Sequence, residues 1–194
     1  MNDKLAIAWC DNGMVDGKFM QGVTDVMLHS GVEVATTLRS QGNQIARQRD
    51  KVINYWYDNN KSDWLLWVDS DVVISPDTFK LLWDNKDVKE RPILTGVYFT
   101  TDQPEEPLME PMPTLFNFVA NGDEIGVKRV HPLPKNKLLQ GHGKNFMGED
   151  IYFFALCDKA DIPVWAHTAA TVPHMKRFSF DVNYYDAFVG NKRK

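Results

Sequence analysis

The first 100 residues alternate between short apolar runs and longer stretches with helical spacing, and this alternation limits the folds open to the chain. The apolar runs have strand length and lie at residues 5–10, 32–38, 64–68 and 92–99. Helical patterning separates them at residues 24–29, 43–57 and 76–83. Strands that alternate with helices are typical of a mainly parallel sheet covered on both faces. The sequence therefore predicts an α/β fold.

The second half of the chain has a different pattern. Residues 102–113 are rich in Pro and Glu and predict no regular element. The other predicted features are a hairpin of residues 114–120 and 125–130, a loop at 131–148, a helix at 149–160 and short strands at 164–166 and 170–172. We expect a smaller subregion here, attached to the α/β half.

Bulk properties exclude several classes of protein. The 194 residues suit one domain, and 43% hydrophobic residues allow a true core. The net charge of −4 argues against a nucleic-acid partner. Two cysteines outside any CxxC pattern suit a reducing compartment, and no apolar run has the length of a membrane span. We therefore expect a cytoplasmic protein.

The apolar run at residues 64–68 ends abruptly in Asp69-Ser70-Asp71. Ligands of open α/β sheets bind beyond the carboxyl ends of strands. Carboxylates are natural ligands of Mg²⁺ and Mn²⁺, which commonly share their coordination shell with phosphate. Asp-X-Asp alone is a weak signal, since it also fits a solvated turn or a helix N-cap. Its position after a buried strand favours a site for a hard cation and a phosphorylated ligand.

Four further polar groups lie at the ends of predicted strands or the starts of predicted helices: Cys10-Asp11-Asn12, Ala46-Arg47-Gln48-Arg49, Gly148-Glu149-Asp150 and Pro173-His174. Each has a simpler interpretation. The first group fits turn chemistry, Arg47 fits a solvated helix face, and the acidic pair fits the positive end of a helix dipole. A lone histidine is more often structural than a ligand. Their order along an α/β chain is what favours a shared site.

Five segments carry a resemblance to a known family: AIAWCDN, IARQRD, WLLWVDSDVVISPDTF, ILTGVYF and MGEDIYFFALCDKADIPVWAHTAATVPHM. Together they resemble the nucleotide-sugar-dependent glycosyltransferases of the GT-A fold. The nearest likeness is the compact kind of large DNA viruses and phages, such as chlorovirus glycosyltransferase domains. The resemblance covers roughly residues 4–176, and its most specific part is GED-x-x-F with a later histidine and an upstream DXD.

The resemblance implies a single GT-A domain over residues 1–194, with a Rossmann-like sheet. Residues 1–100 would form the nucleotide-sugar-binding half, and residues 101–194 the acceptor and catalytic half. Asp71 and His174 would ligate Mn²⁺ or Mg²⁺, and a mixed carboxylate and imidazole shell suits Mn²⁺ at least as well. The other donor-binding residues would be Cys10, Asp11 and Asn12 at the base and ribose, Arg47 near the nucleotide, and Asp69 with Ser70.

The resemblance also implies a reaction. Sugar would pass from a nucleoside-diphosphate sugar, with UDP-sugar favoured, to a hydroxyl of a glycan or glycoprotein. Asp150 would be the catalytic base of an inverting transfer, and Glu149 would help to hold the acceptor. The residue types agree with this chemistry, because a cation stabilises the diphosphate leaving group and a carboxylate can take the acceptor proton. For a viral protein, the location would be the host cytoplasm.

Two alternatives stay open. A sugar nucleotidyltransferase shares the sheet and acidic ligands, but it usually carries a Gly-rich basic loop near the N-terminus. Here residues 10–18 hold Lys18 as their one basic residue. The second alternative is a non-catalytic nucleotide- or sugar-binding module of a larger chain, which would not need Asp150. Residues 100–147 match no motif of the family, so the acceptor is unassigned.

Overall fold

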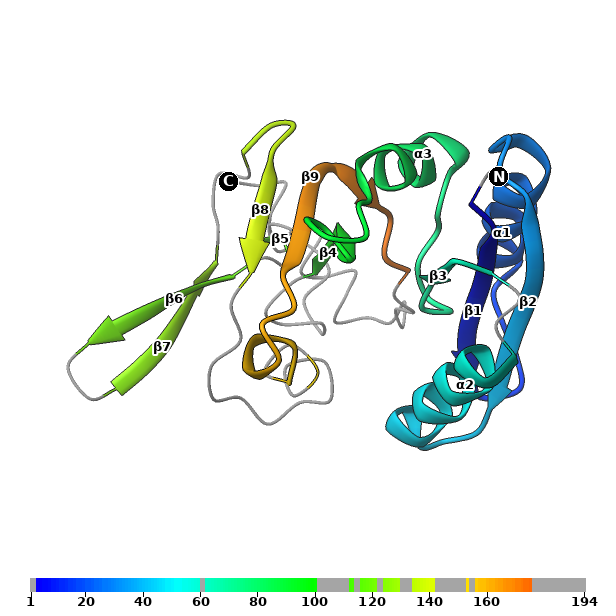
Figure 1. Ribbon diagram of the computed structural model, residues 1–194, viewed down its shortest axis with the longest axis horizontal. Helices are drawn as coiled ribbons and strands as arrows, with labels where there is room; N and C mark the ends of the chain where they lie inside the picture. The colour runs from blue at the N-terminus through cyan, green and yellow to red at the C-terminus, as the bar shows by residue number, and fades with distance from the viewer. Residues whose placement is uncertain are drawn as a thin grey trace, which may run out of the picture.

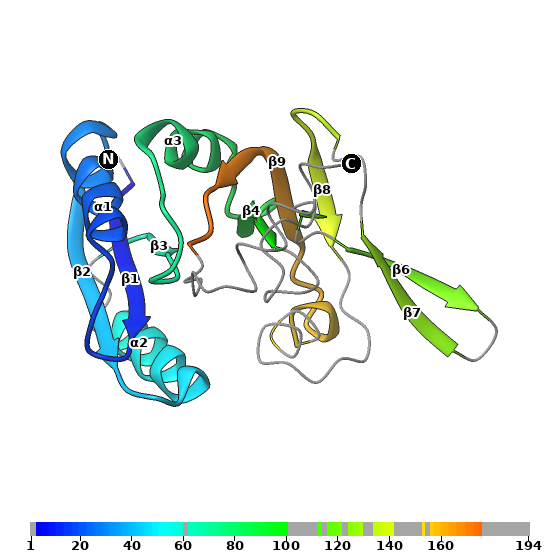
Figure 2. The same ribbon diagram turned by 180° about the vertical axis from the view of Figure 1, so that it is seen from behind.

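The computed structural model describes residues 3–59, 62–100, 112–113, 116–121, 124–129, 134–141, 153 and 156–175. Within these residues the strands form a three-stranded sheet, a four-stranded sheet and a two-stranded hairpin. Figure 1 shows the first sheet at one end of the molecule, the second sheet beside it and the hairpin at the opposite end. Figure 2 shows the same order from behind.

The first sheet is parallel, as the sequence predicts. It contains β1 (Leu5–Asp11), β2 (Val34–Gln41) and β3 (Trp64–Trp67) in the order β2-β1-β3. Every residue of the central strand β1 is buried. The chain passes outward from β1 to β2 and then returns to the other side of β1 for β3. The carboxyl ends of β1 and β3 therefore flank the point where the strand order reverses, which is the usual ligand position in such sheets.

The helices α1 (Gly17–His29) and α2 (Ile45–Asn59) cover opposite faces of this sheet. Right-handed crossovers require this, because the connections through α1 and α2 run in opposite directions across the sheet. Phe19 of α1 packs in one core with Ile7, and Val52 of α2 packs in the other with Ala8. The predicted helices on both faces are confirmed. Helix α1 begins earlier than expected, since the Asp16 carboxylate caps it by accepting from the Lys18 amide at 2.8 Å.

Helix α3 (Pro76–Asn85) starts where the Ser-Pro-Asp sequence predicts. The Ser75 hydroxyl accepts a hydrogen bond from the Thr78 amide at 3.1 Å, and Pro76 occupies the first turn, where its missing amide costs nothing. Buried Phe79 joins the core that α1 forms with β1. Helix α3 also packs against α1 and against the second sheet.

The second sheet is mixed, with the order β5-β4-β9-β8. Its strands are β4 (Ile93–Thr100), β5 (Met112–Pro113), β8 (Leu138–Gly141) and β9 (Val164–Val172). Strands β4 and β9 are parallel, and the two outer pairings are antiparallel. The chain is thus an α/β protein whose parallel sheet is small.

Three expectations for this half need correction. Strand β8 lies within the predicted loop at residues 131–148, and β5 lies within the stretch expected to be irregular. The two short strands predicted at 164–166 and 170–172 belong to one strand, β9. Its pairing with β4 passes from Thr95 opposite Ala166 to Val97 opposite Thr171, so the intervening residues of β9 bulge.

The hairpin prediction is confirmed. Strands β6 (Phe116–Asn121) and β7 (Glu124–Arg129) pair in antiparallel register, with Asn121 opposite Glu124. Of the predicted helix at 149–160, Phe153 and residues 156–159 are described and are helical. No helix in the described part of the chain is long and apolar enough to cross a membrane.

The two main sheets meet at the segments that follow β3 and β9. The Val73 amide donates to the Pro173 carbonyl at 3.0 Å, and the Met175 amide donates to the Asp71 carbonyl at 2.7 Å. Val72 and His174 form an isolated bridge between them. Backbone pairing thus brings the DXD segment against the end of β9.

Candidate functional site

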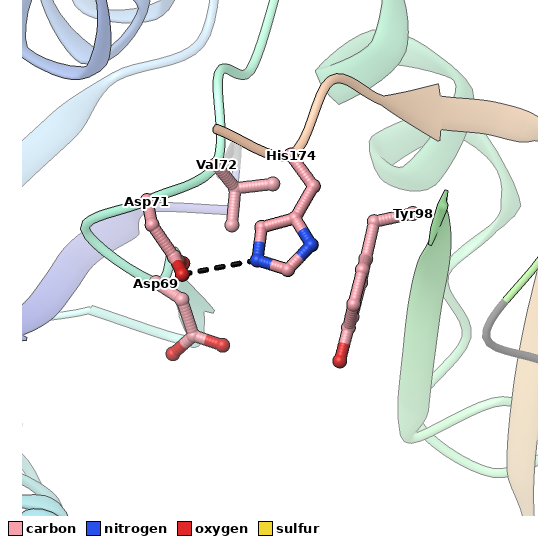
Figure 3. Close-up of a pocket in the computed structure, with 5 residues that line it drawn as sticks. All are labelled: Asp69, Asp71, Val72, Tyr98 and His174. Atoms are coloured by element: carbon pink, nitrogen blue, oxygen red, sulfur yellow. Dashed lines mark hydrogen bonds and ion pairs between the residues drawn. The ribbon is translucent and has the colours of Figure 1, made fainter. Parts of the chain in front are cut away.

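A pocket lies at this junction. Its cavity of about 200 Å³ is lined by Asp69, Asp71, Val72, Tyr98 and His174. Figure 3 shows Asp71 and His174 pointing toward one another, while Asp69 and Tyr98 lie on opposite sides of the opening. Its two acidic residues follow β3, the histidine follows β9, and the tyrosine comes from β4.

The imidazole of His174 lies between two hydrogen-bond acceptors. Its Nδ1 atom is 3.3 Å from the Phe99 carbonyl oxygen, and its Nε2 atom is 3.0 Å from Oδ2 of Asp71. A carbonyl and an ionised carboxylate can only accept, and a neutral imidazole has one N–H. When Nδ1 donates to the carbonyl, the lone pair of Nε2 faces the carboxylate. A cation at Nε2, either a proton or a metal ion, removes that repulsion.

The Tyr98 ring holds the same imidazole from the side. The ring centroids are 4.8 Å apart and the planes meet at 72°, an edge-to-face contact. In Figure 3 the hydroxyl end of Tyr98 extends past the imidazole toward the opening. The histidine is therefore fixed by a carbonyl, a carboxylate and an aromatic ring.

A tight turn presents the two DXD carboxylates. The Val72 amide donates to the Asp69 carbonyl at 3.0 Å, and Ser70 lies inside this turn. The side chains of Val72 and Ile74 are buried in the core beside β1. The apolar residues anchor the segment, so the acidic residues beside them face the pocket.

Asp69 is held by two donors from the protein. Its Oδ1 atom accepts from Trp67 Nε1 and from the Arg49 guanidinium, each at 3.1 Å. The guanidinium carbon of Arg49 lies 5.7 Å from the centroid of the Trp67 ring. This arrangement combines an ion pair, a hydrogen bond from a neutral indole to the carboxylate and a cation–π contact.

Asp11, at the end of β1, is a buried carboxylate with both oxygens engaged. Arg39 on β2 donates to it through two nitrogens, at 2.6 and 2.7 Å. The Gly13 amide and Trp9 Nε1 donate to it as well, at 2.7 and 3.2 Å. The Arg39 guanidinium lowers the pKa of Asp11 below its ordinary value, although burial acts in the opposite direction. This carboxylate ties the β1 turn to β2.

The neighbours of Asp11 lie in different environments. Cys10 is buried, which raises the pKa of its thiol, and the charges of Arg49 and Asp69 both act on it. Asn12 is exposed, and its side-chain oxygen lies 3.4 Å from the Met14 amide that donates to it. Within the predicted Cys10-Asp11-Asn12 group, the buried Cys10 thiol thus lies near Asp69 of the DXD.

The predicted site residues other than Cys10, Asp11 and Asn12 separate into three sets. Asp69, Asp71 and His174 line the pocket, with Ser70 in the turn between the two acids. Arg47 is exposed and donates to the Gln44 side chain at 3.2 Å. Glu149 and Asp150 lie outside the described residues, so their catalytic roles remain predictions.

Arg49 belongs to the Ala46–Arg49 segment that the sequence singled out, but the role near the nucleotide was assigned to Arg47, and Arg39 was not predicted at all. Helical spacing offers a signal for Arg49, because it precedes Val52 by three residues and Trp56 by seven, on the side of α2 that packs against the sheet. For Arg39 we find no comparable signal, since its pairing with Asp11 depends on the register between β1 and β2.

The donor set fits a divalent cation that is partly ligated from outside the protein. Asp71 and His174 supply one carboxylate and one imidazole, with Asp69 beside them. No group of three or more His, Cys, Asp or Glu side chains placed to hold a metal occurs among the residues described. A cation here would complete its shell with phosphate oxygens and water, as Mg²⁺ and Mn²⁺ commonly do.

No protein-family model, curated protein or solved structure matches this chain. Any functional assignment therefore has to come from the residues of the pocket and from the sequence motifs themselves.

Proposed function

We propose that this protein is a metal-dependent glycosyltransferase of the GT-A type. It moves a sugar from a nucleoside-diphosphate sugar, with UDP-sugar favoured, to a hydroxyl group of a glycan. The DXD after β3 and the histidine after β9 support the proposal. The class of donor comes from the resemblance of the sequence to such enzymes. The carboxylates and the imidazole of the pocket would hold the cation that accompanies its diphosphate.

The position of His174 is the observation that carries this proposal. Its Nε2 atom faces Asp71 Oδ2 at 3.0 Å while its Nδ1 atom faces a backbone carbonyl. Metal-binding histidines commonly donate their second ring N–H to a carbonyl in this way, which fixes the ring and its tautomer. Two residues 103 positions apart in the chain thus come within hydrogen-bond distance, and they would share one cation.

Asp71 and His174 would hold Mn²⁺ or Mg²⁺, and Asp69 would contact the ribose or the nucleotide. A cation bound there supplies Lewis-acid stabilisation of the charge that develops on the diphosphate leaving group. Because the described residues offer few ligands for a cation at this pocket, we expect cation and nucleotide to bind together rather than independently.

The acceptor side of the proposal comes from the sequence. Asp150 would take the proton of the attacking hydroxyl, and Glu149 would hold the acceptor sugar. A single base that activates the acceptor corresponds to an inverting transfer. Asp150→Asn is then expected to abolish transfer while sparing donor binding, because the amide keeps the shape of the side chain but cannot take a proton.

A screen of donor hydrolysis tests this function. The protein is incubated with UDP-glucose, UDP-galactose and UDP-N-acetylglucosamine and with their guanosine and thymidine counterparts, with Mn²⁺ or with chelator. Slow release of the nucleoside diphosphate that needs Mn²⁺ and falls at least about tenfold in His174→Ala supports the proposal. Release that is unchanged by chelator and by this variant contradicts it.

A non-catalytic nucleotide-binding module is the second candidate. It rests on the described lining of the pocket, which comes from the DXD segment, β4 and the end of β9 and offers groups for a cation and a nucleotide. Mn²⁺-dependent binding of UDP without any hydrolysis or transfer, in the presence of simple sugar acceptors, would select this candidate over the enzyme.

A further inference from the structure

We propose that Arg49 and Trp67 position the Asp69 carboxylate for the donor nucleotide, and that Arg49 is therefore a determinant of donor affinity. This inference rests on the proposed function, because it assigns a role to a residue beside the same pocket. It concerns a residue of the Ala46–Arg49 segment to which the family resemblance assigned no role.

The contacts converge on one oxygen of Asp69. Arg49 reaches from α2 and Trp67 Nε1 from β3, and both donate to Oδ1 at 3.1 Å. Two donors on one oxygen fix the rotation of the carboxylate. Asp69 lines the pocket, whereas neither of these two donors does, so they act on a ligand through the carboxylate that they hold.

Arg49 is itself held in place, unlike an ordinary surface arginine. Its side chain is 21% exposed, whereas the Asp69 side chain is 45% exposed. The guanidinium lies 5.7 Å from the centroid of the Trp67 ring, so one aromatic residue orients both members of the ion pair. A pre-oriented guanidinium loses less conformational freedom when it holds a carboxylate than a flexible lysine would.

The neighbouring arginine provides a comparison. Arg47 lies two residues earlier on α2, is exposed and donates to Gln44. The family resemblance points to Arg47 as the arginine near the nucleotide, whereas the contacts point to Arg49. If Arg49 acts through Asp69, its loss should weaken nucleotide binding more than the loss of Arg47.

A double-mutant cycle between Arg49→Ala and Asp69→Asn tests the inference. Binding of UDP is measured by calorimetry at saturating Mn²⁺, and the stability of each variant by urea unfolding. We expect Arg49→Ala alone to raise Kd about tenfold, which corresponds to about 1.4 kcal/mol, and to raise it less than about twofold in the Asp69→Asn background. Lys51→Ala, an exposed change on the same helix, is the control and should leave Kd unchanged.

Conservative variants keep the test decisive. Arg49→Lys should recover part of the affinity, since it keeps the charge but lacks the planar fork. Trp67→Phe keeps an aromatic ring and removes the indole donor, so it should raise Kd by about threefold. A cycle between Trp67→Phe and Arg49→Ala reads the same coupling if Asp69→Asn binds too weakly to measure or if a variant fails to fold.

The outcomes separate the two proposals. Failure of the wild-type protein to bind UDP with Mn²⁺ would overturn the proposed function, and this inference with it. Normal wild-type binding together with additive effects of Arg49→Ala and Asp69→Asn would overturn the inference alone. The inference would also fail if Arg47→Ala weakened binding as much as Arg49→Ala.

Discussion

At the scale of single residues, the buried carboxylate of Asp11 and the exposed carboxylate of Asp71 have distinct roles that their partners determine. Asp11 has both oxygens occupied by protein donors and a fully buried side chain, so it organises the end of β1. Asp71 has a histidine as its partner and lies at an opening. The motif identified Asp71 without a structure, because DXD lies after an apolar strand. The ion pair of Asp11 with Arg39 could not be predicted, because it requires the strand register.

The ion pair between buried Asp11 and exposed Arg39 predicts a loss of stability in acid. Because the pKa of Asp11 is lowered in the folded protein, its contribution to stability is present above the unfolded value, about 3.9, and is lost as pH falls through the folded value. The free energy of unfolding of the wild type, measured with urea, should therefore decrease as the pH drops below about 4. Arg39→Met should lower stability at pH 7 and reduce the further loss in acid. Parallel pH curves for the two proteins would contradict the role of this pair.

At the scale of elements, helix α1 packs closely against the segment after the DXD. A Cβ atom at Gly22 would collide with the backbone carbonyl oxygen of Ile74, and backbone cannot move aside cheaply. Gly17, in the first turn of the same helix, has no atoms within 4 Å of the equivalent position. Gly22 therefore determines how closely helix α1 approaches the segment that carries Asp71.

This difference predicts opposite effects of two identical substitutions. Gly22→Ala should destabilise the protein by about 2 kcal/mol through overpacking and should also weaken nucleotide binding, because the DXD segment shifts. Gly17→Ala should be neutral or stabilising by about 0.5 kcal/mol, since alanine restricts the unfolded chain. Chemical denaturation of both variants checks this. Equal stability changes would mean that the contact at Ile74 does not constrain the helix.

Lys86 fastens the C-terminal end of α3 to the start of the chain. Its ammonium group lies 5.0 Å and 4.0 Å from the ring centroids of Trp64 and Trp83, and 2.8 Å from Asp3. Lys86→Met, which keeps the apolar stem, should cost about 1 kcal/mol of stability. The exposed ion pair of Lys80 with Asp84 offers a matched control, and Lys80→Ala should cost less than about 0.5 kcal/mol. If thermal unfolding showed that Lys80→Ala destabilises the protein more than Lys86→Met, the contacts of Lys86 with the aromatic rings would make no net contribution to stability.

Elements differed in how well the sequence predicted them. Strands β1 and β3, the cap of α3 and the β6–β7 hairpin carry local signals, namely apolar runs, Ser-Pro-Asp and Asn-Gly-Asp, and all were predicted. Strand β8 was missed because its place in the sheet comes from pairing with β9, not from its own sequence. The sequence therefore predicts the elements that local residues determine, but not those that depend on pairing with distant strands.

At the scale of the whole molecule, the proposed site coincides with the junction of two sheets. Residues 71–73 pair with residues 173–175 through backbone hydrogen bonds, and the metal-ligand candidates Asp71 and His174 lie on the two paired segments. A ligand that bridges these side chains would also fasten the sheets together. The sequence indicated that these residues share a site but not that the site joins two sheets.

This coincidence predicts a coupled response of distant segments. Addition of UDP and Mn²⁺ should slow amide hydrogen exchange at Val73 and Met175 together, by up to about 100-fold at concentrations near 100 times Kd. The β6–β7 hairpin, at the opposite end of the molecule from the first sheet, should be unaffected (Figure 1). Protection of one segment without the other would show that the ligand does not bridge the junction.

Calorimetric titration of UDP, with and without Mn²⁺, is the decisive measurement for a nucleotide site at the DXD. The wild type, Asp71→Ala and the exposed control Asp50→Ala are compared under the same conditions. We predict binding that requires Mn²⁺, is lost in Asp71→Ala and is retained in Asp50→Ala. If UDP, guanosine diphosphate and thymidine diphosphate all fail to bind to the wild type with Mn²⁺, Asp69-Ser70-Asp71 is a structural turn and the glycosyltransferase assignment is wrong.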